Sequence, residues 1–127
     1  MKPFATPLHE AVHRFITQGE GSFEALALEV FAYQFHHNAP YRRFCQEQGI
    51  VPEKVQDWRD IPAVPTAAFK ALPLTCRPPE EAEALFLSSG TTQGPQSRSR
   101  HYVFDLRLYH AAIRDWFARH LLPDLPP

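Results

Sequence analysis

The chain has 127 residues, about the size of one domain, and 44% of them are hydrophobic, which excludes a disordered composition. Thirteen Lys and Arg residues stand against fourteen Asp and Glu residues, and this net charge of -1 disfavours a protein held to nucleic acid by positive charge. No stretch approaches the roughly 20 apolar residues of a membrane-spanning helix, and polar residues interrupt the amino-terminal segment where a signal peptide would be apolar. We therefore expect a cytoplasmic protein in which Cys45 and Cys76 are free thiols.

Three helices are predicted in the first part of the chain. Apolar side chains at helical spacing mark the second helix, residues 23–37, most strongly. The first helix covers residues 7–17 and begins with a proline at its first position. The third covers residues 41–48, and we expect Pro40 to open it and Gly49 to end it.

Residues 50–83 are predicted to form a connector stiffened by proline. The chain has thirteen prolines against five glycines, and four of the prolines in this segment follow a branched apolar residue. Because a residue that precedes proline avoids helical geometry, the segment is expected to be largely extended. One helical turn is expected at residues 66–71, with Thr66 as its cap.

Two short strands and a longer helix are predicted after the connector. Apolar runs at about residues 84–88 and 100–104 flank a segment rich in glycine and hydroxyl groups, which predicts an antiparallel pair. A helix follows from its cap, Asp105, to about Leu122. The chain is thus expected to be mostly α-helical with one short β-hairpin.

Aromatic residues dominate the predicted core. They recur at helical spacing on the second and the last predicted helix, and such stripes are more often core than a ligand pocket. The residues concerned are Phe23, Phe31, Phe35, Tyr109, Trp116 and Phe117. We expect Phe31 to be deeply buried, and the face of the last helix that carries Trp116 and Phe117 to be adhesive in the isolated chain.

The segment between the two strands carries the candidate site. It is rich in hydroxyl side chains and glycine, has no acidic residue, and is followed by arginines. Backbone N–H groups turned toward one point bind phosphate oxygens, and arginine adds positive charge to the same anion. The candidate phosphate-binding residues are Ser88, Ser89, Gly90, Thr91, Thr92, Gly94, Arg98 and Arg100. A simple hairpin connection made of turn residues remains the alternative.

The sequence FLSSGTT at residues 86–92 resembles the phosphate-binding motif of the adenylate-forming ligases. That family usually continues with a glycine, one residue, a proline and often a lysine. Here QGPQ follows at residues 93–96, so the glycine comes one place late and the lysine is absent.

Within that superfamily, the chain is most similar to the acyl-protein synthetase (luciferin-component ligase) family. The similarity extends from about residue 20 to the end of the chain, through YRRFC at 41–45, WRDIPAVP at 58–65 and DLRLY at 105–109. The resemblance implies an α/β fold, with this chain as the N-terminal portion of the large domain. The portion would consist of helices (1–49), a proline-rich connector (50–83), a strand–loop–strand unit (84–104) and a helix (105–122).

The resemblance implies an ATP-dependent ligase. A fatty acid carboxylate would attack the α-phosphate of ATP to give acyl-AMP, and the acyl group would then pass to a protein thiol and on to a reductase partner. Ser88 to Thr92 would hold the β- and γ-phosphates, Mg²⁺ would bridge them, and no protein ligand for the metal is identified. The catalytic residues would lie beyond residue 127 in a missing C-terminal part, so the isolated chain is expected to be inactive.

A second class of function stays open, a stand-alone helical interaction module with a hydroxyl-rich surface hairpin. Two other candidate sites, for a metal and for a hydrolase reaction, have weaker support from the sequence. A metal site at His36, His37 and Cys45 is disfavoured because adjacent helical residues face apart, and cations commonly occupy helix ends. A hydrolase built on Ser89 and His101 would lack the G-x-S-x-G elbow.

Overall fold

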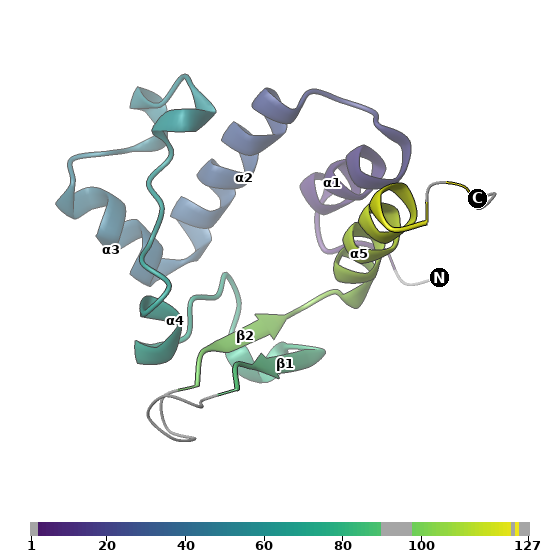
Figure 1. The fold of residues 1–127 in the computed structure, drawn as a ribbon. Coiled ribbons are helices and arrows are strands. Elements are labelled where there is room, and N and C mark those ends of the chain that lie inside the picture. The colour runs from purple at the N-terminus through teal and green to yellow at the C-terminus, as the bar shows by residue number, and fades with distance from the viewer. Residues whose placement is uncertain (1–2, 90–97, 123, 125–127) are drawn as a thin grey trace.

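A computed structural model describes residues 3–89, 98–122 and 124 of the chain. Helices make up most of this part, and two short strands form an antiparallel pair, as predicted (Figure 1). In chain order the elements are α1 (Pro7–Gln18), α2 (Phe23–His37), α3 (Ala39–Glu47), α4 (Ala68–Ala71), β1 (Ala84–Leu87), β2 (Arg100–Val103) and α5 (Leu106–His120). Within this described part, no helix is both long and apolar enough to cross a membrane.

Side-chain caps set the starts of the first three helices. The hydroxyl of Thr6 accepts the N–H of His9 at α1, and the hydroxyl of Ser22 caps α2. Helix α3 begins two residues before the predicted start, because the Asn38 side chain accepts the N–H of Tyr41 at 3.2 Å. Pro40 therefore lies inside the first turn of α3, and the prediction that it opens the helix is wrong.

Helix α3 ends at a left-handed glycine, as predicted. Gly49 has a φ of 71°, a conformation that side chains with a Cβ rarely adopt. Its N–H donates to the carbonyl of Gln46 at 2.9 Å, and the N–H of Ile50 donates to the carbonyl of Cys45 at 3.0 Å. The chain reverses direction at this point, so the connector that follows packs against α2 and α3.

The core lies where the connector packs against α2 and α3. Its buried residues are Phe31, Phe35, Tyr41, Cys45 and Val55, and half-buried apolar residues of the connector surround them. The connector holds its course through short 3₁₀ turns (Pro52–Lys54, Trp58–Asp60 and Pro79–Glu81) and the single turn of α4. The hydroxyl of Thr66 does not cap α4, contrary to prediction; Thr66 offers its backbone carbonyl to Phe69 instead.

One side-chain hydrogen bond anchors the connector to α3. The phenol of Tyr41, 8% exposed, donates to the carbonyl of Pro62 at 2.7 Å. Burial, followed by a hydrogen bond with Cys45, raises the pKa of this phenol well above its usual range. The phenol is therefore a protonated donor near neutral pH.

Replacing Tyr41 with Phe is expected to lower the free energy of unfolding by about 1 kcal/mol, because it leaves a carbonyl unpaired. Urea denaturation followed by circular dichroism measures the change. Tyr102→Phe is the matched control, because Tyr102 is half-buried and its phenol donates to no described residue; its effect should stay within about 0.5 kcal/mol. Equal losses in both variants would contradict the anchoring role.

The hairpin is short and regular. Ala84 pairs with Val103 and Leu87 pairs with Arg100, so each strand is one residue shorter than predicted. Past the last pair, the N–H of Ser88 still donates to the carbonyl of Ser99 at 3.0 Å. The ends of the intervening loop are therefore held together.

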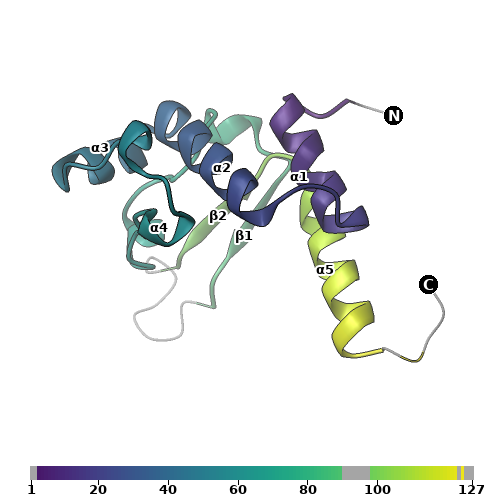
Figure 2. The same ribbon diagram turned by 90° about the horizontal axis from the view of Figure 1, so that it is seen from above.

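Helix α5 lies against α1, so the first and the last helix of the described chain are neighbours (Figure 2). Asp105 caps α5 by accepting the N–H of Arg107, and Glu83 accepts the N–H of Leu106, each at 2.9 Å. The Arg107 guanidinium pairs with Asp105 at 2.6 Å and donates to the carbonyl of Pro3 at 3.3 Å. This arginine ties the start of the chain to the junction of β2 and α5.

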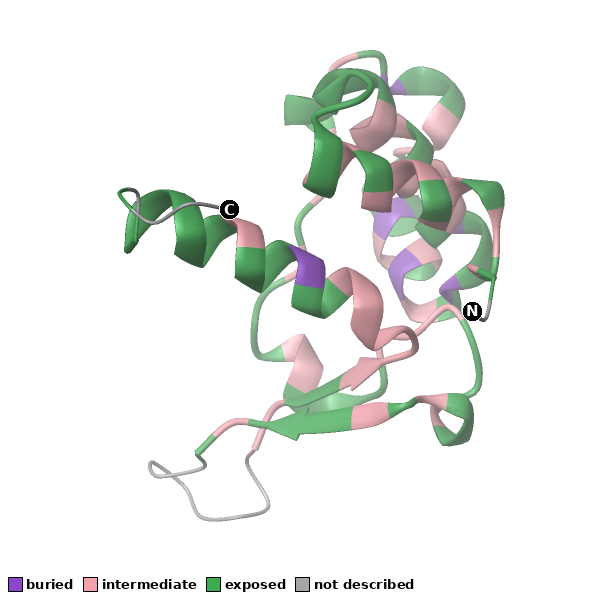
Figure 3. Cartoon of the chain, turned by 90° about the vertical axis from the view of Figure 1, so that its right-hand side faces the viewer, coloured by how far each residue is buried: buried purple, intermediate pink, exposed green. Residues whose placement is uncertain are grey.

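The predicted aromatic core is only partly confirmed. Phe31 and Phe35 are 2% and 6% exposed, but Phe23 is 48% exposed and lies beside the ring of Trp58. The stripe on α5 is exposed at Tyr109, Trp116 and Phe117, and Ala111 is that helix's buried residue (Figure 3). The core prediction is wrong for Phe23, which lies near the rings of Phe15 and Trp58 but stays largely exposed. The exposure of Trp116 and Phe117 agrees with the predicted adhesive face of the last helix.

Candidate functional site

The base of the candidate phosphate loop is built by two serines. The N–H of Ser99 donates to the hydroxyl oxygen of Ser88 at 2.8 Å, which adds to the backbone bond between the same residues. Four predicted site residues, Gly90, Thr91, Thr92 and Gly94, lie outside the described residues. The structure thus describes the two ends of the predicted phosphate-binding segment, residues 88–89 and 98–100.

Ser88 contacts the opposite end of the loop, and its predicted contact with phosphate stays a prediction. It is half-buried, and its oxygen accepts a backbone N–H of the opposite end of the loop. The hydroxyl proton still remains as a donor. Ser88 therefore positions the loop's ends, while Ser89, the next residue, is exposed.

The two arginines after the loop differ in their surroundings. Arg100 is exposed on β2, at the register position opposite Leu87. Arg98 is half-buried, and its Nε is fully buried without a hydrogen-bond partner among the described residues. A buried charged donor without a partner is costly, which suits Arg98 to an anion.

His101 packs with its ring 4.7 Å from the ring of Phe69, which lies on α4. This contact places α4 beside β2, near the base of the loop (Figure 1). His101 is thus in contact with an aromatic ring while the residue remains exposed.

The described residues contain no group of three or more His, Cys, Asp or Glu side chains that could hold a metal ion. His36 and His37 pack against the rings of Phe35 and Tyr33, respectively. Burial raises the pKa of both cysteine thiols, which favours the protonated, unreactive form.

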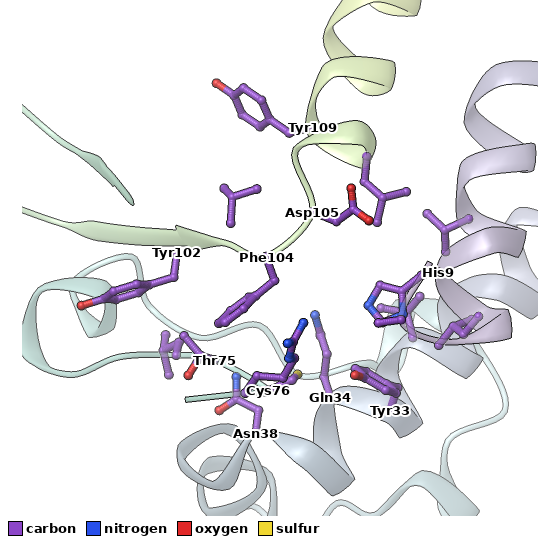
Figure 4. Close-up of a pocket in the computed structure, with 18 of the residues that line it drawn as sticks. His9, Tyr33, Gln34, Asn38, Thr75, Cys76, Tyr102, Phe104, Asp105 and Tyr109 are labelled. Carbon is purple, nitrogen blue, oxygen red and sulfur yellow. The ribbon is translucent and has the colours of Figure 1, made fainter. Parts of the chain in front are cut away.

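Sequence reasoning missed a cavity of about 570 Å³ that is open to solvent on one side and is lined by α1, α2, residues 74–77, β2 and α5 (Figure 4). None of the predicted phosphate-loop residues lines it. No sequence motif marks it, because its walls come from segments that are far apart along the chain.

Known proteins resemble this chain over most of its length. Residues 12–113 match the family described as acyl-protein synthetase, LuxE. A long-chain-fatty-acid–luciferin-component ligase of Vibrio harveyi is 44% identical over 62 residues, and one of Photorhabdus luminescens is 35% identical over 77 residues. No solved structure matches.

The matched regions differ in how much of each relative they cover. The match to the Vibrio harveyi protein covers 49% of this chain and 16% of that protein. The match to the Photorhabdus luminescens protein covers 58% of this chain and 66% of that protein. The chain thus spans less than two thirds of either relative.

Proposed function

Since this chain belongs to the LuxE family of acyl-protein synthetases, we propose that it carries the phosphate-binding loop of an ATP-dependent fatty-acid ligase. The observation that carries the proposal is the family match over residues 12–113, which includes both strands and the hydroxyl-rich loop between them. The names of the two relatives, both long-chain-fatty-acid ligases, support a fatty acid as the substrate.

The proposed chemistry is electrostatic. ATP supplies the activated phosphate to which the acid carboxylate is joined as acyl-AMP, with release of pyrophosphate. In this chain, the loop would offer N–H and hydroxyl donors, and Arg98 and Arg100 would add positive charge to the phosphate oxygens. The unpartnered Nε of Arg98 supports this assignment. Mg²⁺ would accompany the nucleotide, and we assign no step to it because the described residues contain no cluster of ligands for it.

We further propose that residues 1–127 form the N-terminal portion of the large ligase domain. The region matched in the Vibrio harveyi relative is 16% of that protein, which leaves room for the rest of the domain. Catalytic residues, the acyl-accepting protein thiol and contacts with an acyl reductase would then belong to other parts of the enzyme.

The chain alone is expected to bind inorganic phosphate weakly, with a Kd on the order of millimolar, because solvent weakens each contact. A phosphate titration followed by the amide shifts of residues 88–100 measures this, and the affinity should fall as salt is raised. Arg98→Gln should weaken binding, whereas Arg43→Gln, an exposed arginine on α3, is the control. Exchange of pyrophosphate into ATP with fatty acids should be undetectable for this chain alone.

Two results would count against the proposal. A loop that stays unresponsive at high phosphate concentration would favour the alternative, a helical interaction module without nucleotide chemistry. Measurable pyrophosphate exchange by the isolated chain would show instead that it is more than a portion of the ligase domain.

A further inference from the structure

The cavity of about 570 Å³ is a second site, separate from the phosphate loop. Its size falls within the range of small-molecule sites, which is roughly 300–1,000 Å³. In Figure 4, side chains from α1, α2, residues 74–77 and the end of β2 surround one space, into which His9 and Phe104 project. The space therefore does not belong to any single element.

Much of the wall is apolar and half-buried. Helix α1 contributes Leu8 and Val12, helix α2 contributes Val30, and helix α5 contributes Leu108. Each is only partly covered by the protein, so apolar surface stays in contact with solvent. Burying such surface is favourable at about 25 cal/mol per Å², which would favour an apolar occupant.

Hydrogen-bond donors gather on another part of the wall. Asn38 is 8% exposed, and its side-chain oxygen is used by the N–H of Tyr41. Its amide NH₂ donates to no described residue, and neither does the half-buried hydroxyl of Thr75. Both side chains belong to the lining of the cavity and are labelled in Figure 4. These donors are reachable from solvent and could meet an acceptor of a ligand in the cavity.

Arg77 brings the positive charge to this part of the cavity. Its Nε pairs with Glu81 at 3.2 Å, and its guanidinium carbon lies 5.4 Å from the ring centroid of Phe104. Its two terminal nitrogens donate to no described residue. Those two nitrogens match the two oxygens of a carboxylate.

The other titratable groups that line the cavity do not neutralise the positive charge of Arg77. The pKa of His9 is lowered, mainly by burial and also by the nearby charge of Arg77. The charge of Asp105 offsets part of this shift. Burial also raises the pKa of Tyr33 and of Cys76, so both are uncharged near neutral pH. Asp105 is paired with Arg107. The carboxylate that competes for Arg77 is therefore that of Glu81, which occupies Nε and leaves the two terminal nitrogens to a ligand.

We propose that this cavity binds an amphipathic monocarboxylate, with its carboxylate on Arg77, Thr75 and Asn38 and its aliphatic chain along α1, α2 and α5. The evidence for the site is the cavity and its donors, and a fatty acid is the ligand of this class that the proposed ligase function would supply. The site would hold the acid at a place distinct from the phosphate loop.

Dodecanoate, kept below its micelle concentration, is the probe. Its binding should shift the methyl signals of Leu8, Val12, Val30 and Leu108. Arg77→Gln should weaken binding about tenfold, since a charge-assisted hydrogen bond contributes about one factor of ten in affinity. Thr75→Val should weaken it less. Arg43→Gln, the exposed arginine on α3, should leave the affinity unchanged. Dodecan-1-ol, which lacks the carboxylate, should bind wild type and Arg77→Gln equally.

Three results would overturn the inference: no shift at the cavity methyls, shifts confined to the exposed face of α5, or full dodecanoate affinity in Arg77→Gln. A parallel titration with inorganic phosphate tests the proposed function separately from this inference. Phosphate that shifts the loop while dodecanoate leaves the cavity unchanged overturns this inference alone. Dodecanoate in the cavity with a loop that ignores phosphate supports this inference and counts against the ligase loop.

Discussion

Replacing Phe31 with Ala is expected to lower the free energy of unfolding by about 3–5 kcal/mol. The side chain is 2% exposed, and its ring lies 6.3 Å from the ring of Phe35 and 6.1 Å from that of Tyr41. Truncation would remove both contacts and leave a cavity in the place where the connector, α2 and α3 meet. A loss of this size is a large part of the stability of a small domain.

Urea denaturation of the Phe31→Ala protein measures the loss, and Phe23→Ala is the matched control. Both are phenylalanines on α2, but Phe23 is 48% exposed and should lose less than half as much. If the two variants lost the same free energy, the core would not lie where the structure places it.

The exposed end of α5 is expected to make the isolated chain self-associate. Trp116 and Leu121 are 66% and 64% exposed, and Phe117 is 46% exposed, so large apolar side chains face solvent together. Changing Trp116 and Phe117 together to Ser should weaken self-association at least about thirtyfold, because even one central aromatic residue of an interface contributes about 2 kcal/mol or more.

Sedimentation equilibrium across a range of protein concentrations measures the effect. Arg114→Ser changes an exposed residue of the same helix without removing apolar surface, and it should leave the association unchanged. A wild-type chain that sediments as a monomer at every concentration would contradict the prediction.

Local signals in the sequence were sufficient to predict where the helices and strands form. Helix α2 has the predicted bounds, because a serine cap and apolar spacing fix a helix from within its own segment. The strands were found for a similar reason, since both are short apolar runs beside a turn-rich segment. The start of α3 was missed because Asn38, not Pro40, provides the cap.

Burial was harder to predict, because it depends on what lies opposite a residue. Phe31 and Phe23 belong to the same stripe of α2, yet the connector covers Phe31 and leaves Phe23 largely exposed. The same difference between local and long-range information applies to the two candidate sites. The loop could be found from its contiguous motif, whereas the cavity is lined by residues far apart in the chain, such as Asn38 and Arg77.

The bond from Arg107 to Pro3 joins residues at opposite ends of the chain, while the buried core lies within residues 31–55. Helix α5 is mostly exposed and Ala111 is its buried residue, so releasing it would uncover little buried apolar surface. Amide protons of α2 and α3 should therefore exchange with solvent more slowly than those of α5. Transient opening would begin with release of α5 from α1, which exposes the β2–α5 junction to proteases while the α2–α3 core stays folded.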